Sequence, residues 1–479
     1  KWLGMNYTSY GLYYYNRSFA NAGTYTWNVS CSRDGFESKT LNTTISAHDP
    51  NEIYKCVNIT SPGYYFMGQD ILNSSAEICI NITTSDVELD CRNHKIVGNT
   101  SSNTYGIVTY GSNTSHLKNI TVKNCDVSEW KFGIYLLLTN HSTVLNTTIN
   151  NNDYGVVVDN SHNNTLTDLI INGSDLVGMY IVYLSSKNLV ENNTFSQGYY
   201  GLYVDVLSNN NIVRKNAFNN TGYVPVVIDT SSSNTIEHNN VSYPTATPGI
   251  WIYDYSDNNL ILNNKLEECD YGLYISGNSV SNILKNNTIL GSDVYGIFSG
   301  LGSAHNLIAN NTVTSAGDIS VLLHSGADNM VIDNTISFGE EGIRVYNSSF
   351  VTVKNNLLTS VGESGISVGN STSINVTYNK ISNADEYGIG LYEYTRYSLV
   401  AHNIIKSSGQ DNSYYSAGIG LQWRASNNTI VNNNVSNDKD YGMLIWDSGG
   451  ACIDNNISYN RFANSGRDGI LIDLSLIHI

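Results

Sequence analysis

The chain is poor in charged residues and in proline. Lys, Arg, Asp and Glu together make up 14 % of its 479 residues, and only 5 residues are proline. An average globular protein carries roughly 25 % charged residues. Hydrophobic residues make up 41 %, so the chain can build a sizeable core and is not disordered throughout. The length suits either two or three ordinary domains or one elongated repeat domain.

Two further absences exclude classes of partner. No run of apolar residues approaches the roughly 18 that a membrane-spanning helix needs. With 24 Lys and Arg against 41 Asp and Glu, the formal net charge is −17, and no basic patch is available to neutralise phosphates. We therefore expect no membrane span and no nucleic-acid partner. The acidic composition and the 25 Asn-x-Ser/Thr sequons favour an extracellular or cell-surface glycoprotein.

Cysteines are few, and none stand in a C-x-x-C pair, so neither a zinc site nor a thioredoxin-like motif is supported. Four of the seven cysteines fall between residues 56 and 125, where disulfides would hold the start of a repeat region together. We prefer the pairing Cys56–Cys79 and Cys91–Cys125. Buried free thiols stay the alternative, because sequence does not fix connectivity.

The dominant feature of the sequence is a short repeat. Its first block reads aromatic, Gly, aliphatic, any, aliphatic, as in YGVVVD (154–159) and YGIGLY (387–392). A second block, such as VENNTF (190–195), follows about 14 or 15 residues after the Gly. Sixteen copies recur at a spacing of mostly 22–24 residues. A period of this length is typical of a solenoid.

Both blocks alternate with period two, so each predicts a strand, and no copy shows helical periodicity. Short strands of similar sequence, stacked turn on turn, pair parallel and in register. The sequence therefore predicts a right-handed parallel β-helix of about 16 turns. The first and third residues after the Gly, such as Leu202 and Val204, should point into the core, and the second and fourth outward. The Gly itself is expected at a tight corner.

A column of asparagines recurs at one position of the second block. Stacked Asn amides can hydrogen-bond to the turns above and below, so we interpret the column as a structural ladder rather than a ligand site. Its members are Asn193, Asn216, Asn239, Asn264, Asn287, Asn311, Asn334, Asn356, Asn379, Asn403, Asn433 and Asn460.

The chain divides into four predicted segments. Residues 1–48 lack the repeat, and AGTYTWNVSC (22–31) with LNTTISA (41–47) resembles the last strands of an immunoglobulin-like β-sandwich. Residues 49–100 are expected to be a linker and entry turns, and residues 101–473 the repeats. Residues 474–479 resemble a translated sequencing adapter and are expected to be an artefact. Because residue 1 is Lys rather than Met, we expect a fragment of a longer protein.

The entry segment CVNITSPGYYF (56–66) and AEICINITTSDVELDC (76–91), together with the repeats, resembles the NosD-like right-handed β-helix family, as found in archaeal-type surface proteins. That family is grouped with carbohydrate-binding proteins and sugar hydrolases, and the resemblance implies the fold more firmly than an activity. NosD proteins are also linked to copper delivery. Ten scattered His and five Met do not form the clustered ligands that copper needs, so we expect no metal site and no cofactor.

Aromatic residues recur at the second position after the Gly. Aromatic faces stack on the apolar faces of sugar rings, so rings spaced one turn apart can follow a polysaccharide. The alternative is aromatic stacking between turns that stabilises the sheet. The carbohydrate-binding candidates are Tyr135, Tyr180, Tyr203, Trp251, Tyr274 and Phe298.

Acidic residues occupy the fourth position after the Gly in Asp159, Asp205 and Asp229, with Asp254 one residue out of phase. Asp205 and Asp229 should lie about 5 Å apart on adjacent turns, so that one pKa rises or a cation such as Ca²⁺ bridges them. A retaining glycosidase needs carboxyl groups at about that distance. A lyase would also need a basic residue, and none is near this column. The alternative is a solvated acidic surface.

These patterns predict a secreted or cell-surface rod that binds carbohydrate or mediates adhesion. One alternative is a polysaccharide hydrolase or lyase that uses Asp205, Asp229 and Asp254. The other is an architectural spacer in a surface layer.

Overall fold

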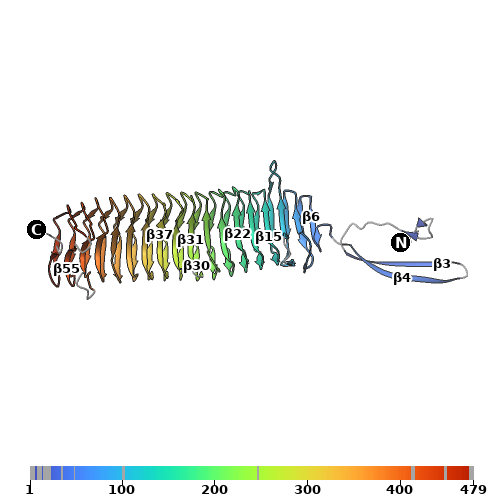
Figure 1. Cartoon of the computed structure of the whole chain (residues 1–479). Helices are drawn as coiled ribbons and strands as arrows, with labels where there is room; N and C mark the ends of the chain where they lie inside the picture. The colour runs from blue at the N-terminus through green and yellow to red at the C-terminus, as the bar shows by residue number, and fades with distance from the viewer. Residues whose placement is uncertain are drawn as a thin grey trace.

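The computed structural model describes residues 6–7, 13–14, 23–33, 36–47, 49–99, 103–244, 247–410, 416–446 and 450–473. These residues form strands and no helix. None of them therefore belongs to a helix that is long and apolar enough to cross a membrane. From residue 50 onward the strands stack into a long rod (Figure 1). Residues 474–479, the expected artefact, lie outside the described residues.

The N-terminal residues form strand pairs that are separate from the rod. Strands β3 (Gly23–Arg33) and β4 (Phe36–Ala47) pair antiparallel and extend from the N-terminal end of the rod (Figure 1). A short pair, β1 (Asn6–Tyr7) with β2 (Tyr13–Tyr14), precedes them. Both expected strands are present, and the immunoglobulin-like sandwich stays a prediction.

The rod is a right-handed parallel β-helix, as the sequence predicts. Its principal sheet, which we call the Gly sheet, contains the strands of the first repeat block, paired in register from turn to turn. There are eighteen such strands rather than sixteen, because two entry turns without the Gly precede the repeats. They are β6 (Val57–Ile59), β8 (Ile78–Ile82), β11 (Tyr105–Tyr110), β15 (Phe132–Leu137), β19 (Tyr154–Asp159), β22 (Val177–Val182), β25 (Tyr200–Val204), β28 (Val226–Asp229), β31 (Pro248–Tyr253), β34 (Tyr271–Ile275), β37 (Tyr295–Gly300), β40 (Ile319–His324), β43 (Glu341–Tyr346), β46 (Ile366–Gly369), β49 (Tyr387–Tyr392), β52 (Ala417–Gln422), β55 (Tyr441–Trp446) and β58 (Ile470–Asp473).

The second repeat block forms two strands, where the sequence predicted one. In VENNTF the chain forms β23 (Leu189–Glu191), bends, and continues as β24 (Thr194–Ser196). The bend occurs because Asn192 adopts a left-handed backbone with φ of 57°, which Asn tolerates better than most residues. Each full turn therefore contributes to three sheets. The second sheet runs from β5 (Glu52–Ile53) to β56 (Asn456–Ser458), and the third from β10 (Lys95–Val97) to β57 (Arg461–Ala463).

The core is a continuous column of aliphatic side chains along the rod. The first and third residues after the Gly, such as Leu202 and Val204, are fully buried, as predicted. The Gly is not at a corner: Gly201 lies within β25. A Cβ there would lie 2.5 Å from the carbonyl oxygen of Pro225 and 2.8 Å from the ring of Phe218, so the close approach of two sheets is what requires glycine.

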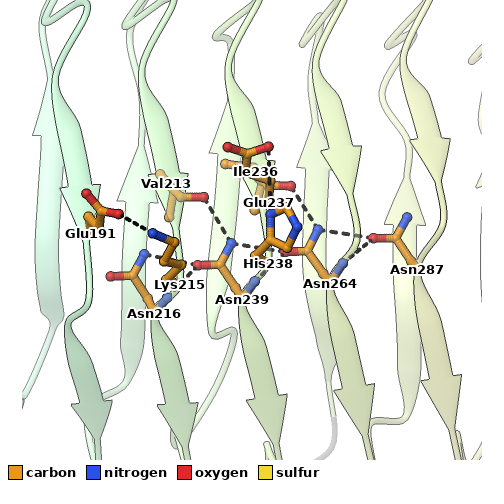
Figure 2. A network of polar contacts seen from close by, with 10 residues as sticks. All are labelled: Glu191, Val213, Lys215, Asn216, Ile236, Glu237, His238, Asn239, Asn264 and Asn287. Carbon is orange, nitrogen blue, oxygen red and sulfur yellow. Dashed lines mark hydrogen bonds and ion pairs between the residues drawn. The ribbon is translucent and has the colours of Figure 1, made fainter.

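The asparagine column forms the predicted ladder (Figure 2). The backbone N–H of Asn239 donates to Oδ1 of Asn264 on the next turn at 3.0 Å, and its Nδ2 donates to the carbonyl of Val213 on the previous turn at 3.0 Å. Each buried amide therefore satisfies backbone groups at the corner between two sheets. A second ladder, which the sequence analysis missed, runs along another corner through Asn164, Asn188, Asn211, Asn234, Asn259, Asn282, Asn306 and Asn329.

Two disulfides lie in the entry turns. Cys56 is bonded to Cys79, and Cys91 to Cys125, which is the pairing that the sequence analysis preferred. They join neighbouring turns at the N-terminal end of the core.

Candidate functional site

The predicted aromatic column lies on the outer face of the Gly sheet, where its members contact one another. Tyr180 packs edge-on against Tyr203 with ring centroids 5.7 Å apart, and Tyr274 stacks on Phe298 at 4.3 Å. Phe298 points outward from the core, as predicted, but it is only 6 % exposed, because the neighbouring rings and aliphatic side chains cover it. These contacts are the ones expected if aromatic stacking between turns stabilises the sheet, which is the alternative to carbohydrate binding.

The tyrosines of this column also hydrogen-bond to the predicted acidic column. Each hydroxyl donates to the carboxylate on the following turn: Tyr135 to Asp159 at 2.6 Å, Tyr180 to Asp205 at 2.8 Å and Tyr203 to Asp229 at 2.7 Å. Trp251 makes the equivalent bond to Ser276 at 3.0 Å. The acids of this column therefore have hydrogen-bond partners within the fold. The sequence of one repeat block does not show these partners, because they lie on the neighbouring turn.

Asp205 and Asp229 follow Val204 and Ile228, which pair in register, so the two acids lie on adjacent turns. Burial raises the pKa of Asp205, with a further increase from the charge of Asp229, against hydrogen bonds from Tyr180 and Val206. Asp254 does not continue the acidic column, because the residue that pairs with Asp229 on the next turn is Tyr253. Among the described residues, no group of three or more His, Cys, Asp or Glu side chains is placed so that it could hold a metal ion. A calcium role for this pair stays a prediction.

A groove of about 600 Å³ lies farther along the same sheet. It extends over seven consecutive turns, from β37 to β55. Its lining is Tyr295, Ile319, Leu322, His324, Glu341, Arg344, Tyr346, Glu363, Ser364, Ser367, Gly369, Glu386, Tyr387, Tyr392, Glu393, Gln422, Trp423 and Trp446. None of these is among the site residues predicted from the sequence.

The groove exists because the outward column changes from large to small residues. At the position occupied by Tyr274 and Phe298, later strands have Ser367, Gly390 and Gly420, paired in register. Larger side chains from neighbouring positions lie over these glycines. A Cβ on Gly420 would lie 2.6 Å from the ring of Tyr387. The small residues thus leave a hollow with aromatic walls.

A buried carboxyl group lies against an arginine in the groove wall. Glu341 is 1 % exposed and contacts the guanidinium of Arg344 three residues later. Burial raises the pKa of Glu341 to about 7, and the negative charge of Glu363 adds to the rise, while Arg344 and a hydrogen bond from Ser367 oppose it. Glu363 is exposed on the following turn. The groove therefore contains one carboxyl group that holds its proton near neutral pH beside one that is open to solvent.

Aromatic hydroxyls connect the other carboxylates and polar groups. Tyr346 donates to Oε2 of Glu393 at 2.9 Å, and the hydroxyls of Tyr392 and Ser364 are 3.2 Å apart. Nε2 of Gln422 donates to the hydroxyl of Tyr387. Burial raises the pKa of Tyr387 above the usual range. These tyrosines therefore act as neutral hydrogen-bonding groups.

Solved structures similar to this chain include a polysaccharide epimerase and a bacteriophage tailspike protein. The mannuronan C-5 epimerase AlgE4 A-module of Azotobacter vinelandii is 14 % identical, with a TM-score of 0.37, covering 72 % of this chain and 87 % of that one. The tailspike protein of E. coli bacteriophage HK620 is 11 % identical, with a TM-score of 0.38, covering 85 % and 71 %. At these values the likeness concerns the fold alone. No curated protein matches the chain.

Two family models match the sequence. The model described as periplasmic copper-binding protein (NosD) matches residues 89–268 and 222–338, which together span more than half of the chain. The right-handed β-helix region model matches residues 320–476. Copper would need clustered imidazole or sulfur ligands. No group of three or more His, Cys, Asp or Glu in the described part of the chain could hold a metal ion, so the donor set does not fit such a site. By its sequence and its fold, the chain belongs to the NosD family of right-handed β-helix proteins.

Proposed function

We propose that this chain binds a polysaccharide along the groove of the Gly sheet. The observation that supports the proposal is a single hollow, about 600 Å³ in volume, whose walls combine aromatic rings with carboxylates over seven turns. Sugar rings present an apolar face and a rim of hydroxyl groups. Aromatic side chains suit the face and acceptor oxygens suit the rim.

The length of the groove suits a polymer better than a single sugar. Six steps of about 4.8 Å separate the turn of Tyr295 from that of Trp446, so the groove runs about 29 Å along the rod. A glycan chain lying parallel to the rod axis would contact every turn in between.

The charge of the groove favours a neutral or amino-sugar main chain. Glu341, Glu363, Glu386 and Glu393 line it, against one arginine, Arg344. A polymer with an acid on every unit would meet like charge along most of this length. The carboxylates instead accept hydrogen bonds from sugar hydroxyls or ammonium groups.

The proposed setting is outside the cytoplasm, on a secreted or surface-attached adhesive protein. Two disulfides in the entry turns support it, because disulfides persist in oxidising compartments. The 25 sequons point the same way.

Hydrolysis of the bound glycan is the second candidate function. In the sequence analysis this activity was assigned to Asp205, Asp229 and Asp254. The groove offers a better pair: Glu341, whose pKa is about 7, and the exposed Glu363. Glycosidases use two carboxyl groups, one that protonates the leaving oxygen and one that activates water or attacks the sugar.

The test is binding of neutral polysaccharides to the purified chain, measured by affinity electrophoresis, with reducing ends assayed in the same samples. Trp423→Ala/Trp446→Ala should abolish retention, while Tyr255→Ala, an exposed aromatic outside the groove, should not. Retention without products supports binding alone, and products lost in Glu341→Gln support hydrolysis. If no polymer is retained, the architectural spacer becomes the better description.

A further inference from the structure

Two smaller hollows, which we call the arginine hollows, lie at the turn that follows the Gly sheet. Their volumes are about 450 and 290 Å³. Both are lined by Tyr394, Arg396 and Tyr397, and the second also by Arg424. Their remaining walls are small, polar or aliphatic residues, and neither hollow has an acidic residue in its lining.

The arginine hollows continue from the groove. Strand β49 ends at Tyr392, after which Glu393 lines the groove and Tyr394 lines the hollows. On the next turn Trp423 lines the groove and Arg424 the second hollow. On both turns, therefore, one residue lines the groove and the next residue lines a hollow. A branch or a bend of a glycan bound in the groove can reach the hollows directly, on the same side of the rod.

The guanidinium of Arg424 is held in place with donors to spare. Its Nη1 donates to the hydroxyl of Tyr394 at 2.7 Å, and its carbon lies 5.3 Å from the centre of that ring. A guanidinium has five N–H donors in a rigid plane, and this bond uses one of them. Stacking on tyrosine fixes the plane of the group, which reduces the entropy lost when it binds a ligand.

The charges of Arg396 and Arg424 are not neutralised within the described residues. Neither forms an ion pair there, whereas Arg214, Arg344 and Arg467 each pair with a carboxylate. Arg92 and Arg461 also form no ion pair within the described residues, but only Arg396 and Arg424 line the arginine hollows. Arg396 and Ser426 form a bridge between adjacent turns, so the two arginines lie close together at one corner of the rod.

We infer that Arg396 and Arg424 form a subsite for an anionic substituent, a carboxylate or a sulfate, on the glycan bound in the groove. The inference rests on the proposed function and refines its ligand class. The groove has four glutamates against one arginine, and the hollows have two arginines and no acid. The ligand that complements both regions is a mainly neutral polymer with sparse acidic groups. A guanidinium group donates two parallel hydrogen bonds to a planar carboxylate, and it donates in a similar way to the oxygens of a sulfate.

The experiment compares polymers that differ only in charge. Dextran, xylan and hydroxyethyl cellulose are each tested beside a lightly carboxymethylated and a lightly sulfated derivative, with the dissociation constant measured by titration calorimetry at low and high salt. We expect a derivative to bind at least tenfold more tightly than its parent at low salt, with the gain reduced by salt. The carboxymethylated and sulfated arms identify the preferred anion.

Arg396→Gln/Arg424→Gln should remove that gain and leave binding of the neutral parent unchanged. Arg461→Gln, an exposed arginine near the end of the rod, is the matched control and should retain the gain. Equal binding of derivative and parent by the wild type would overturn the subsite while leaving the groove intact. Equal loss of both ligands in the double variant would also overturn it. Absence of binding to every polymer would overturn the proposed function itself, and the subsite with it.

Discussion

Tyr346 and Glu393 are hydrogen-bonded across an intervening turn of the solenoid, with 2.9 Å between the hydroxyl and Oε2. The intervening residue in this column is Gly369, which pairs with Tyr346 on one side and with Tyr392 on the other. The ring of Tyr346 lies over it, so a Cβ on Gly369 would be 2.9 Å from that ring. The shape of the groove wall therefore depends on one missing side chain.

Replacing Gly369 by Val should displace the ring of Tyr346 and break its bond to Glu393. We expect polysaccharide affinity to fall at least tenfold, while stability falls by about 1–3 kcal/mol, as for other overpacked sites. Titration calorimetry and chemical denaturation measure the two effects. Tyr346→Phe keeps the ring and removes only the hydroxyl, so its effect on affinity should be smaller. Unchanged affinity in Gly369→Val would show that this wall does not contact the ligand.

The repeat made the fold predictable. Strand alternation and period specified parallel stacking, and Leu202 and Val204 face the core as expected. What the repeat did not reveal was local backbone geometry. The left-handed conformation of Asn192 divides one predicted strand into two. Nothing in the sequence VENNTF shows which Asn lies at a bend and which lies in a strand. The Gly looked like a corner residue because its contacts with Phe218 and the next turn are tertiary.

The site was harder to predict, because the groove follows from small residues in the outward column, whereas large aromatic residues are the usual mark of a sugar site. The aromatic residues up to Phe298 pack against each other, and the groove extends from that turn over later turns, where Ser367 and Gly390 occupy the same column. Glu341 lies in β43, one of the copies of the first repeat block, but its raised pKa depends on its burial in the fold and on Glu363 and Ser367 of the next turn. The sequence signal for the groove is the run of small residues in this outward column.

The asparagine ladder should contribute strongly to stability. Asn311 is 1 % exposed, accepts from the backbone N–H of Asn287 at 2.9 Å and donates to the carbonyl of Leu284 at 2.9 Å. Asn311→Leu leaves both backbone groups buried without partners, so we expect a loss of roughly 2–4 kcal/mol. Thr312→Leu, at the adjacent exposed position, is the control and should be nearly neutral. Denaturant unfolding followed by circular dichroism measures both. Equal midpoints for the two variants would contradict a stabilising ladder.

Stability should decrease as the pH rises toward neutral. Burial raises the pKa of Asp438 to about 7, against a hydrogen bond from the backbone N–H of Ser408. The folded chain therefore holds a proton that the unfolded chain releases near the usual value of about 3.9. Between these values the folded state binds more protons at this group, so the contribution of Asp438 to stability is fully present below the unfolded pKa and is lost as pH rises to about 7.

Asp438→Asn should reduce this pH dependence and stabilise the rod at pH 8 by roughly 2–4 kcal/mol. At the equivalent position of an earlier turn, Asn152 accepts from the N–H of Trp130 and donates to the carbonyls of Val127 and Asn150, so the amide has a place in the fold. Glu341, whose pKa is also about 7, should leave a residual slope. Unfolding curves at pH 5 and pH 8 give the comparison, and an unaltered slope in the variant would assign the titration elsewhere.

The thiol of Cys269 should be inert in the folded protein. Burial is the main cause that raises its pKa to about 12, and nearby acids, Asp270 first among them, add to the rise. Because the thiolate is the reactive form, iodoacetamide at pH 8 should leave Cys269 unmodified for hours and label it within minutes after unfolding in guanidinium chloride. Peptide mass spectrometry locates the label. Asp270→Asn should change the native rate little, since burial dominates. Rapid native labelling would mean that the turns around residue 269 open often, and would contradict a continuously packed core at that point of the rod.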